Sequence, residues 1–133
     1  MIPERQRLCV SMTKRVLVVD DNPVTRELIR EVLDSPDLQV LEAADGREAF
    51  ARISEAIPDL MLLDIRMPGQ SGFEVLRRIR EDPRLDSLRV LAFTAFAMHE
   101  DCRKALAAGF DGYITKPINP SDLRRQIELL LSL

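Results

Sequence analysis

The sequence predicts an α/β fold, a doubly wound five-stranded parallel sheet with helices on both faces. Short apolar segments alternate with segments of helical period five times between residues 15 and 131. Alternating strands and helices favour a parallel sheet between two helical layers, joined by right-handed crossovers. The first and third apolar segments are apolar at nearly every position, as expected of strands covered on both faces. At 133 residues, the chain has the length of one domain.

The predicted strands are short segments rich in leucine and valine. They are RVLVVD (15–20), LQVLEA (38–43), DLMLLD (59–64), LRVLAFT (88–94) and FDGYIT (110–115). Residues 1–14 show no sustained period and carry mixed charge. We expect them to form an N-terminal tail without regular structure, ahead of one domain at residues 15–133.

Each predicted strand is followed by a segment of helical period. The predicted helices cover residues 23–33, 45–57, 71–81, 98–108 and 120–131. In the first of them, apolar residues recur at helical spacing and form one stripe, at positions 24, 28, 29, 32 and 33. Asp45 with Glu48, and Ser71 with Glu74, have the spacing of a capping box. Gly109 is typical of a helix end in the left-handed conformation.

Composition excludes several classes of function. The net charge of -3 gives no electrostatic basis for binding nucleic acid directly. The two cysteines, Cys9 and Cys102, do not have C-x-x-C spacing, and the single histidine is His99, which argues against a zinc site and against histidine-based catalysis. No apolar run approaches the roughly 20 residues that a membrane span needs. We therefore expect a cytoplasmic protein that does not bind membranes.

Polar side chains stand where the predicted strands end. Asp20 and Asp21 follow the first strand, Asp64 the third, Thr94 the fourth and Lys116 the fifth. Any one of them alone could be an ordinary loop or capping residue. In a doubly wound sheet, however, ligands bind beyond the carboxyl ends of the strands, beside the switch in strand order. We therefore expect these five residues to converge on one site.

Three carboxylates and one lysine in a small volume carry a formal charge of about -2 and need a counterion. Oxygen ligands without thiol or imidazole select Mg²⁺, with Mn²⁺ as an alternative. Mg²⁺ commonly shares its ligands between one or two carboxylates and phosphate oxygens. A carboxylate can also accept a phosphoryl group as an acyl phosphate. The pattern indicates magnesium-dependent phosphoryl chemistry.

At this point the sequence resembles the receiver domain of response regulators in two-component signalling, of the single-domain type. The matching segments are VVDDNP, LLDIRMPGQSG, AFTAFAM and GYITKPI, in the order of the family. The resemblance covers residue 15 to about residue 131. It implies the flavodoxin-like topology of receivers, with strand order 2-1-3-4-5.

The resemblance also implies a role for each acid. Asp64 corresponds to the phosphoacceptor, and Asp20 and Asp21 to the acids that bind the metal together with Asp64. The backbone carbonyl of Arg66 corresponds to the remaining protein ligand of the metal.

Three further residues acquire roles by the same resemblance. Thr94 and Lys116 correspond to the residues that contact the phosphoryl group. Thr94 and Tyr113 correspond to the conformational switch, and the bond before Pro117 to a peptide that is cis in relatives.

Beside the site, Arg66 and Phe96 occupy positions that vary in the family. We expect their bulk to hinder water and to lengthen the life of the phosphorylated form.

The implied function is that of a phosphoacceptor signalling protein, not of an enzyme acting on a separate substrate, although it catalyses its own phosphorylation and slow dephosphorylation. The implied donor is a histidine kinase or a histidine phosphotransfer protein, and the implied target is a downstream signalling protein. Because no effector segment follows the last predicted helix, the expected output is partner binding by a monomer or a weak phosphorylation-dependent dimer.

Alternative functions make different demands on the same residues. A flavodoxin that binds FMN would need a loop rich in serine, threonine and glycine after the first strand, where this chain has two acids that would repel phosphate. A phosphatase of the haloacid dehalogenase type would need a D-x-D pair there and a cap domain. A receiver detached from a hybrid histidine kinase, and an interaction scaffold that is never phosphorylated, remain open.

Overall fold

A computed structural model describes residues 13–67, 69–94 and 99–131. Five parallel strands form one sheet in the order β2-β1-β3-β6-β7. Their bounds are β1 (Lys14–Val19), β2 (Leu38–Ala43), β3 (Leu60–Asp64), β6 (Arg89–Thr94) and β7 (Gly112–Thr115). Counted along the chain, these strands have the order 2-1-3-4-5. The predicted fold class and topology are confirmed.

Each predicted helix is present. The helices are α2 (Pro23–Val32), α3 (Gly46–Glu55), α4 (Gly72–Arg80), α5 (His99–Ala108) and α6 (Pro120–Leu131). The largest differences from the predicted bounds are two residues, at the end of α3 (57 predicted, 55 observed) and at the start of β7 (110 predicted, 112 observed). No helix in the described ranges has the length and apolar character that crossing a bilayer requires.

Capping residues explain where the helices begin. The Asp45 side chain accepts a hydrogen bond from the Glu48 N–H at 2.8 Å, and Glu48 Oε1 accepts one from the Ala44 N–H at 2.7 Å. The first bond is that of the predicted capping box, but the Glu48 side chain bonds to the residue before the N-cap and not to Asp45 itself. Ser71 also caps its helix, but its Oγ accepts from the Phe73 N–H at 3.1 Å and not from that of Glu74.

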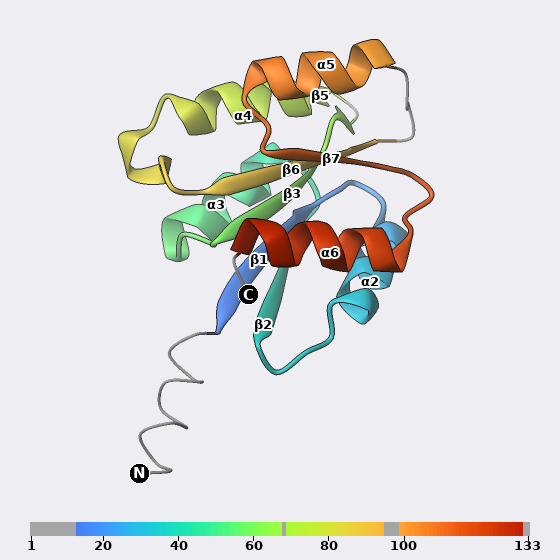
Figure 1. Ribbon diagram of the computed structural model, residues 1–133. Coiled ribbons are helices and arrows are strands. Elements are labelled where there is room, and N and C mark those ends of the chain that lie inside the picture. Colours follow the sequence, from blue (N-terminus) through green and yellow to red (C-terminus); the bar gives the residue numbers. More distant parts are fainter. Residues whose placement is uncertain (1–12, 68, 95–98, 132–133) are drawn as a thin grey trace.

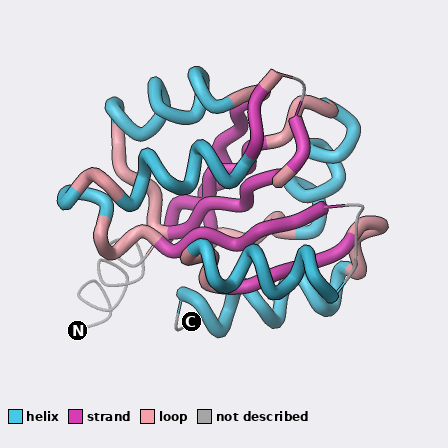
Figure 2. Tube along the Cα trace, turned by 90° about the horizontal axis from the view of Figure 1, so that it is seen from above, coloured by secondary structure: helices cyan, strands magenta, loops and turns pink. Residues whose placement is uncertain are grey.

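The helices form a layer on each side of the sheet (Figures 1 and 2). Strand residues alternate between two cores, with Leu17 and Val19 in one and Val16 and Val18 in the other. The first core is closed by buried side chains of α3, α4 and α5, and the second by those of α2 and α6. Because both faces are covered, β1 and β3 are buried throughout except at the first residues of β1.

Three short elements were not predicted. β4 (Arg66–Met67) and β5 (Gln70–Ser71) form an antiparallel hairpin directly after the third strand of the sheet. Gly69 has a φ of 73°, in the left-handed region that favours glycine at a tight turn. A 3₁₀ turn, η1 (Pro83–Leu85), follows α4. Strands of two residues are too short for a periodic pattern, and the Pro68–Gly69 pair signals a turn without indicating the strands beside it.

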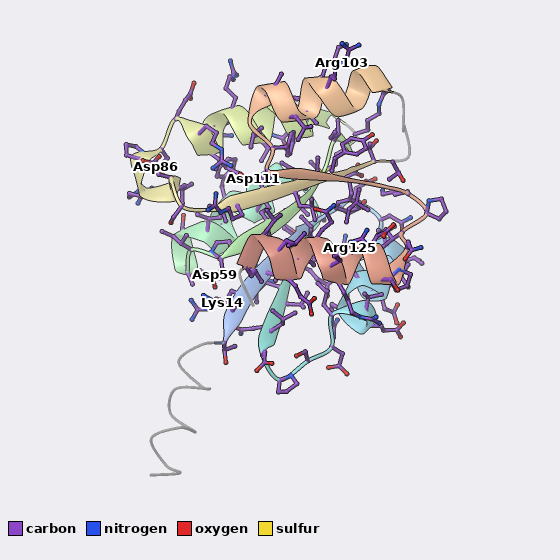
Figure 3. All side chains as sticks on the ribbon, in the orientation of Figure 1. Lys14, Asp59, Asp86, Arg103, Asp111 and Arg125 are labelled. Carbon is purple, nitrogen blue, oxygen red and sulfur yellow. The ribbon has the colours of Figure 1, made fainter. Side chains whose placement is uncertain are left out.

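The edge of the sheet where the strands begin is held by ion pairs and backbone bonds. Arg80 of α4 donates to Asp111 Oδ2 at 3.0 Å and to the Leu88 carbonyl at 2.9 Å. Figure 3 labels Lys14, Asp59 and Asp111, which stand where β1, β3 and β7 begin. The opposite edge, where the strands end, carries the predicted site.

Candidate functional site

Three acids meet at the carboxyl ends of β1 and β3. Asp20 and Asp21 follow β1, and Asp64 is the last residue of β3. One carboxylate oxygen of each lies within 4.8 Å of the others. Asp20 and Asp64 are buried, whereas Asp21 is exposed. Adjacent parallel strands bring these carboxylates together, as the sequence predicted.

Lys116 lies between the two buried acids. Its Nζ is 3.0 Å from Asp20 Oδ2 and 3.3 Å from Asp64 Oδ2. The Lys116 N–H donates to the Thr94 carbonyl at 2.8 Å, which ties the residue to the end of β6. The peptide bond between Lys116 and Pro117 is cis, as expected. The Lys116 ammonium also lies 5.0 Å from the centre of the Phe93 ring, within the range of a cation–π contact.

The second oxygen of each buried acid is held by backbone. Asp20 Oδ1 accepts from the Asn22 N–H at 2.9 Å, and Asp64 Oδ1 accepts from the Arg66 N–H at 3.1 Å. Each carboxylate therefore has one oxygen on a backbone N–H and the other on the lysine. This arrangement orients both carboxylates and gives each of their oxygens a hydrogen-bond partner in a buried site.

The remaining predicted residues that the structure describes differ in burial. Thr94 is buried at the last position of β6, one residue beyond the Phe93 that pairs with Asp64. Tyr113 is half-buried on β7 and packs against the core shared by α3, α4 and α5. Arg66 is exposed in β4. Phe96 lies outside the described residues.

Burial sets the proton affinity of the predicted acceptor. It raises the pKa of Asp64 from 3.8 to about 6, with the nearby Asp20 carboxylate acting in the same direction and Lys116 opposing both. For Lys116, burial alone would lower the pKa, but the hydrogen bond to Asp20 and the charges of Asp64 and Asp20 raise it overall. The lysine is therefore charged near neutral pH, and the Asp64 carboxylate is mainly ionised.

A family model for the response regulator receiver domain matches residues 16–128, from the third residue of β1 to most of the last helix. The chain belongs to this family. The sequence-based identification as a receiver is therefore confirmed.

Relatives of this receiver domain include signalling proteins of about the same length. The chain is 40% identical over 113 residues to an uncharacterized 14.6 kDa protein in the sodA1 3′ region of Leptolyngbya boryana, covering 85% of this chain and 86% of the relative. It is 37% identical over 108 residues to the polar-differentiation response regulator DivK of Brucella ovis, covering 81% of this chain and 88% of that protein.

Solved receivers have the same fold. The chemotaxis protein CheY4 of Vibrio cholerae matches with a TM-score of 0.82 and 30% identity, covering 89% of this chain and 98% of that chain. A putative response regulator from Chloroflexus aurantiacus matches with a TM-score of 0.84 and 29% identity, covering 90% of this chain and 98% of that one.

The donor atoms of this receiver suit a hard divalent cation. The three clustered side chains offer only carboxylate oxygens, and such ligands favour Mg²⁺ over the metals that prefer thiol or imidazole. Lys116 compensates part of the negative charge but reaches only the Oδ2 atoms of Asp20 and Asp64. The exposed Asp21 carboxylate makes no hydrogen bond or ion pair with the described residues, so it stays available to a cation.

Several residues at the site carry no chemical signal in the sequence. Arg26 donates to the Asp20 carbonyl, and Gln70 of the hairpin accepts from the Gly46 N–H at 3.0 Å. In the described part of the chain, a cavity of about 480 Å³ lies beside Thr94, with Arg66 and Lys104 in its lining. A surface arginine, lysine or glutamine in a helix or turn has no distinctive spacing. These contacts could only be found from coordinates.

Proposed function

We propose that this receiver domain accepts a phosphoryl group on Asp64 from the phosphohistidine of a histidine kinase or histidine phosphotransfer protein. The observation that carries the proposal is the buried Asp64 carboxylate, 3.3 Å from Lys116 Nζ and clustered with Asp20 and Asp21. A buried nucleophile next to a fixed cation and two further acids is the arrangement that phosphoryl transfer to a carboxylate requires.

In this reaction an Asp64 carboxylate oxygen attacks phosphorus. A P–O bond forms as the P–N bond to the donor imidazole breaks, and the departing ring nitrogen takes up a proton. A pKa of about 6 keeps Asp64 mainly ionised near neutral pH, so the nucleophile is in its reactive form. The Lys116 ammonium would shift toward the phosphoryl oxygens, and the Thr94 hydroxyl would donate to another of them.

We assign the metal ligands to Asp20, Asp21, Asp64 and the backbone carbonyl of Arg66. Bound Mg²⁺, or Mn²⁺ in its place, would neutralise charge that develops on the phosphoryl oxygens. Without a cation, the side chains of the three acids repel each other, and Lys116 offsets only part of this repulsion.

Phosphorylation is proposed to act through Thr94 and Tyr113. New contacts from the Thr94 hydroxyl to the phosphoryl group would favour one of two conformations, and such differential contacts are what a population shift requires. The affected surface would be that of α5, β7 and α6, on which Leu106 and Leu129 are exposed. α5 and α6 also carry the exposed Arg103 and Arg125 (Figure 3).

The proposed output is binding to a downstream signalling protein in the cytoplasm, by a monomer or a weak phosphorylation-dependent dimer. The names of two relatives support a signalling role, since one is a polar-differentiation response regulator and another a chemotaxis protein. A position within a hybrid histidine kinase would use the same acceptor chemistry.

Labelling with a small phosphodonor such as acetyl phosphate tests the proposal. We expect intact-mass analysis to show the gain of one phosphoryl group that depends on Mg²⁺, is removed by hydroxylamine and is lost in Asp64→Asn. Asp59→Asn is a matched control, because Asp59 stands at the opposite edge of the sheet. A protein that stays unlabelled by small donors and by phosphorylated kinases with Mg²⁺ present would instead be an unphosphorylated scaffold.

A further inference from the structure

Arg26 of α2 contacts the backbone of the loop that carries Asp20 and Asp21. Its Nη1 donates to the backbone carbonyl oxygen of Asp20 at 2.6 Å, and its Nε donates to Glu42 Oε1 at 3.0 Å. The side chain is only 17% exposed. The guanidinium thus reaches back from the helix to the loop that joins β1 to α2.

The carbonyl that Arg26 binds belongs to the peptide between Asp20 and Asp21. The Asp20 N–H is already held by the Ala43 carbonyl at 3.1 Å, and Asp20 Oδ1 by the Asn22 N–H. Because a peptide unit is planar, fixing its oxygen fixes the direction in which the next residue leaves. Among the described residues, the exposed Asp21 side chain has no hydrogen bond or ion pair to hold it, so its direction depends on this peptide.

Glu42 of β2 holds Arg26 in place. Its Oε2 accepts from Arg30 Nη1 at 2.9 Å, and its backbone carbonyl accepts from Arg52 Nε at 3.2 Å. The charge of Arg26 is therefore paired with an acid outside the cluster, and Arg26 does not compete with a metal for the clustered carboxylates. One guanidinium can serve two acceptors in a fixed geometry, which a lysine ammonium cannot reproduce.

We propose that Arg26 is a positioning residue for the cation site, with Glu42 orienting its guanidinium. By holding the peptide between Asp20 and Asp21, Arg26 keeps the Asp21 carboxylate directed toward the acids it must join. This inference rests on the proposed magnesium-dependent function. Groups that orient metal ligands from outside typically change metal affinity by about 10–100-fold when they are removed.

The test is the Mg²⁺ dissociation constant of the unphosphorylated protein, measured by isothermal titration calorimetry. We expect Arg26→Gln to raise it about tenfold, the lower end of that range, because the ligands themselves remain. Arg26→Lys should weaken binding as well, and Glu42→Gln less strongly. Saturating Mg²⁺ should then restore most of the rate of labelling by acetyl phosphate in Arg26→Gln.

Arg30→Gln is the matched control. Arg30 pairs with the same Glu42 carboxylate but does not contact Asp20, and its side chain is 58% exposed. We expect its Mg²⁺ affinity to equal that of the parent, even if both variants lose a little stability. An Arg26→Gln protein that melts at a lower temperature but binds Mg²⁺ as tightly as the parent has lost only a structural contact, which would overturn the inference.

Two further outcomes separate this inference from the proposed function. If Arg26→Gln does not fold by circular dichroism, Arg26→Lys and Glu42→Gln carry the test, and parental affinity in both would refute the positioning role. If the parent binds no Mg²⁺ and behaves as Asp21→Asn does, the metal-dependent function itself is wrong. If the parent binds Mg²⁺, Asp21→Asn does not, and the Arg26 variants bind it as the parent does, the positioning role of Arg26 is rejected and the metal-dependent function stands.

Discussion

Asp64 illustrates the conflict between stability and chemistry in a single residue. The folded protein holds the carboxyl in a buried site that raises its pKa to about 6, while in the unfolded chain it returns to about 3.8. Between these values the folded state binds more protons than the unfolded state. Stability from this group is therefore fully present below about pH 4 and falls as the pH rises through about 6. The protein is therefore less stable with the ionised Asp64 carboxylate, the reactive form, than with the protonated carboxyl.

We therefore predict that Asp64→Asn stabilises the metal-free protein at about pH 8, by an amount on the order of 2 kcal/mol. The amide keeps the shape of the side chain and removes the buried charge. The advantage should disappear near pH 4, where the parent carboxyl is protonated. Urea denaturation in the presence of a chelator at the two pH values measures this difference. A variant that is less stable than the parent at both pH values would show that the contact with Lys116 outweighs burial.

Gly72 illustrates how closely the backbone approaches the acceptor. A Cβ at this position would lie 2.5 Å from the Asp64 carbonyl oxygen and 2.7 Å from the Ile65 Cα, both of which are backbone atoms. The Gly72 N–H also donates to the Ile65 carbonyl at 2.7 Å. The start of α4 is thus packed directly against the chain that follows β3.

We predict that Gly72→Ala lowers the free energy of unfolding by about 2–3 kcal/mol, because backbone must move to admit the methyl group. Gly69→Ala is the comparison. Gly69 has open space around it but a φ of 73°, so only conformational strain of about 1–2 kcal/mol is expected there. Chemical denaturation ranks the two variants. A smaller loss for Gly72→Ala than for Gly69→Ala would mean that α4 can shift away without cost.

At the scale of elements, the β4–β5 hairpin is tied to a distant helix. Gln70 Oε1 accepts the hydrogen bond of the Gly46 N–H in the first turn of α3, and a Cβ on Gly46 would collide with the Gln70 side chain. The hairpin that follows the acceptor is therefore anchored to the helix on which Asp45 forms the N-cap.

We predict that Gln70→Ala costs about 1 kcal/mol, the usual net value of one hydrogen bond. Gly46→Ala should cost a similar amount, because the displaced glutamine can no longer bond to residue 46. The double variant should lose much less than the sum, since the added methyl group then fills the space that the glutamine has left. A double-mutant cycle of unfolding free energies measures the coupling. Additive losses would show that the two residues act independently.

The sequence predicted elements where a pattern repeats and missed them where it does not. In each strand several residues fit an apolar run, and in α2 several fit an apolar stripe at helical spacing. The existence and order of these elements were therefore predictable. The hairpin at Gln70 has two residues in each strand, which is too few for a period. The convergence of Asp20, Asp64 and Lys116 followed from topology, because parallel strands end at one edge. The contact of Arg26 with a carbonyl depends on the rotamer of one side chain and left no pattern.

At the scale of the whole molecule, the proposed cation site would make stability depend on bound Mg²⁺. A cation that binds the folded cluster, and not the dispersed acids of the unfolded chain, would stabilise the protein by mass action. Because the cation requires ionised carboxylates, it competes with the proton on Asp64.

We predict that Mg²⁺ raises the melting temperature more at about pH 8 than at about pH 5, where Asp64 is mainly protonated. Asp21→Asn should abolish the rise at both pH values. Differential scanning fluorimetry with added MgCl₂ measures it, and NaCl at equal ionic strength is the control for screening. An equal rise in Mg²⁺ and NaCl would mean that no specific cation site exists.

Transmission from the site to the surface can be followed with the protein's own fluorophore. The chain has one tyrosine and no tryptophan, so tyrosine emission reports on position 113 alone. Tyr113 is half-buried on β7, the strand that Lys116 directly follows.

We predict that beryllofluoride, a phosphoryl mimic, changes the tyrosine emission when Mg²⁺ is present and has no effect in Asp64→Asn. In Thr94→Ala we expect fluorine NMR to show bound beryllofluoride but a much smaller change in emission, because this variant lacks the hydroxyl that we propose links the phosphoryl group to the switch. If beryllofluoride binds the parent protein and the emission does not change, Tyr113 is not the moving element. The coupling between the site and the surface would then have to run through α5 without the tyrosine.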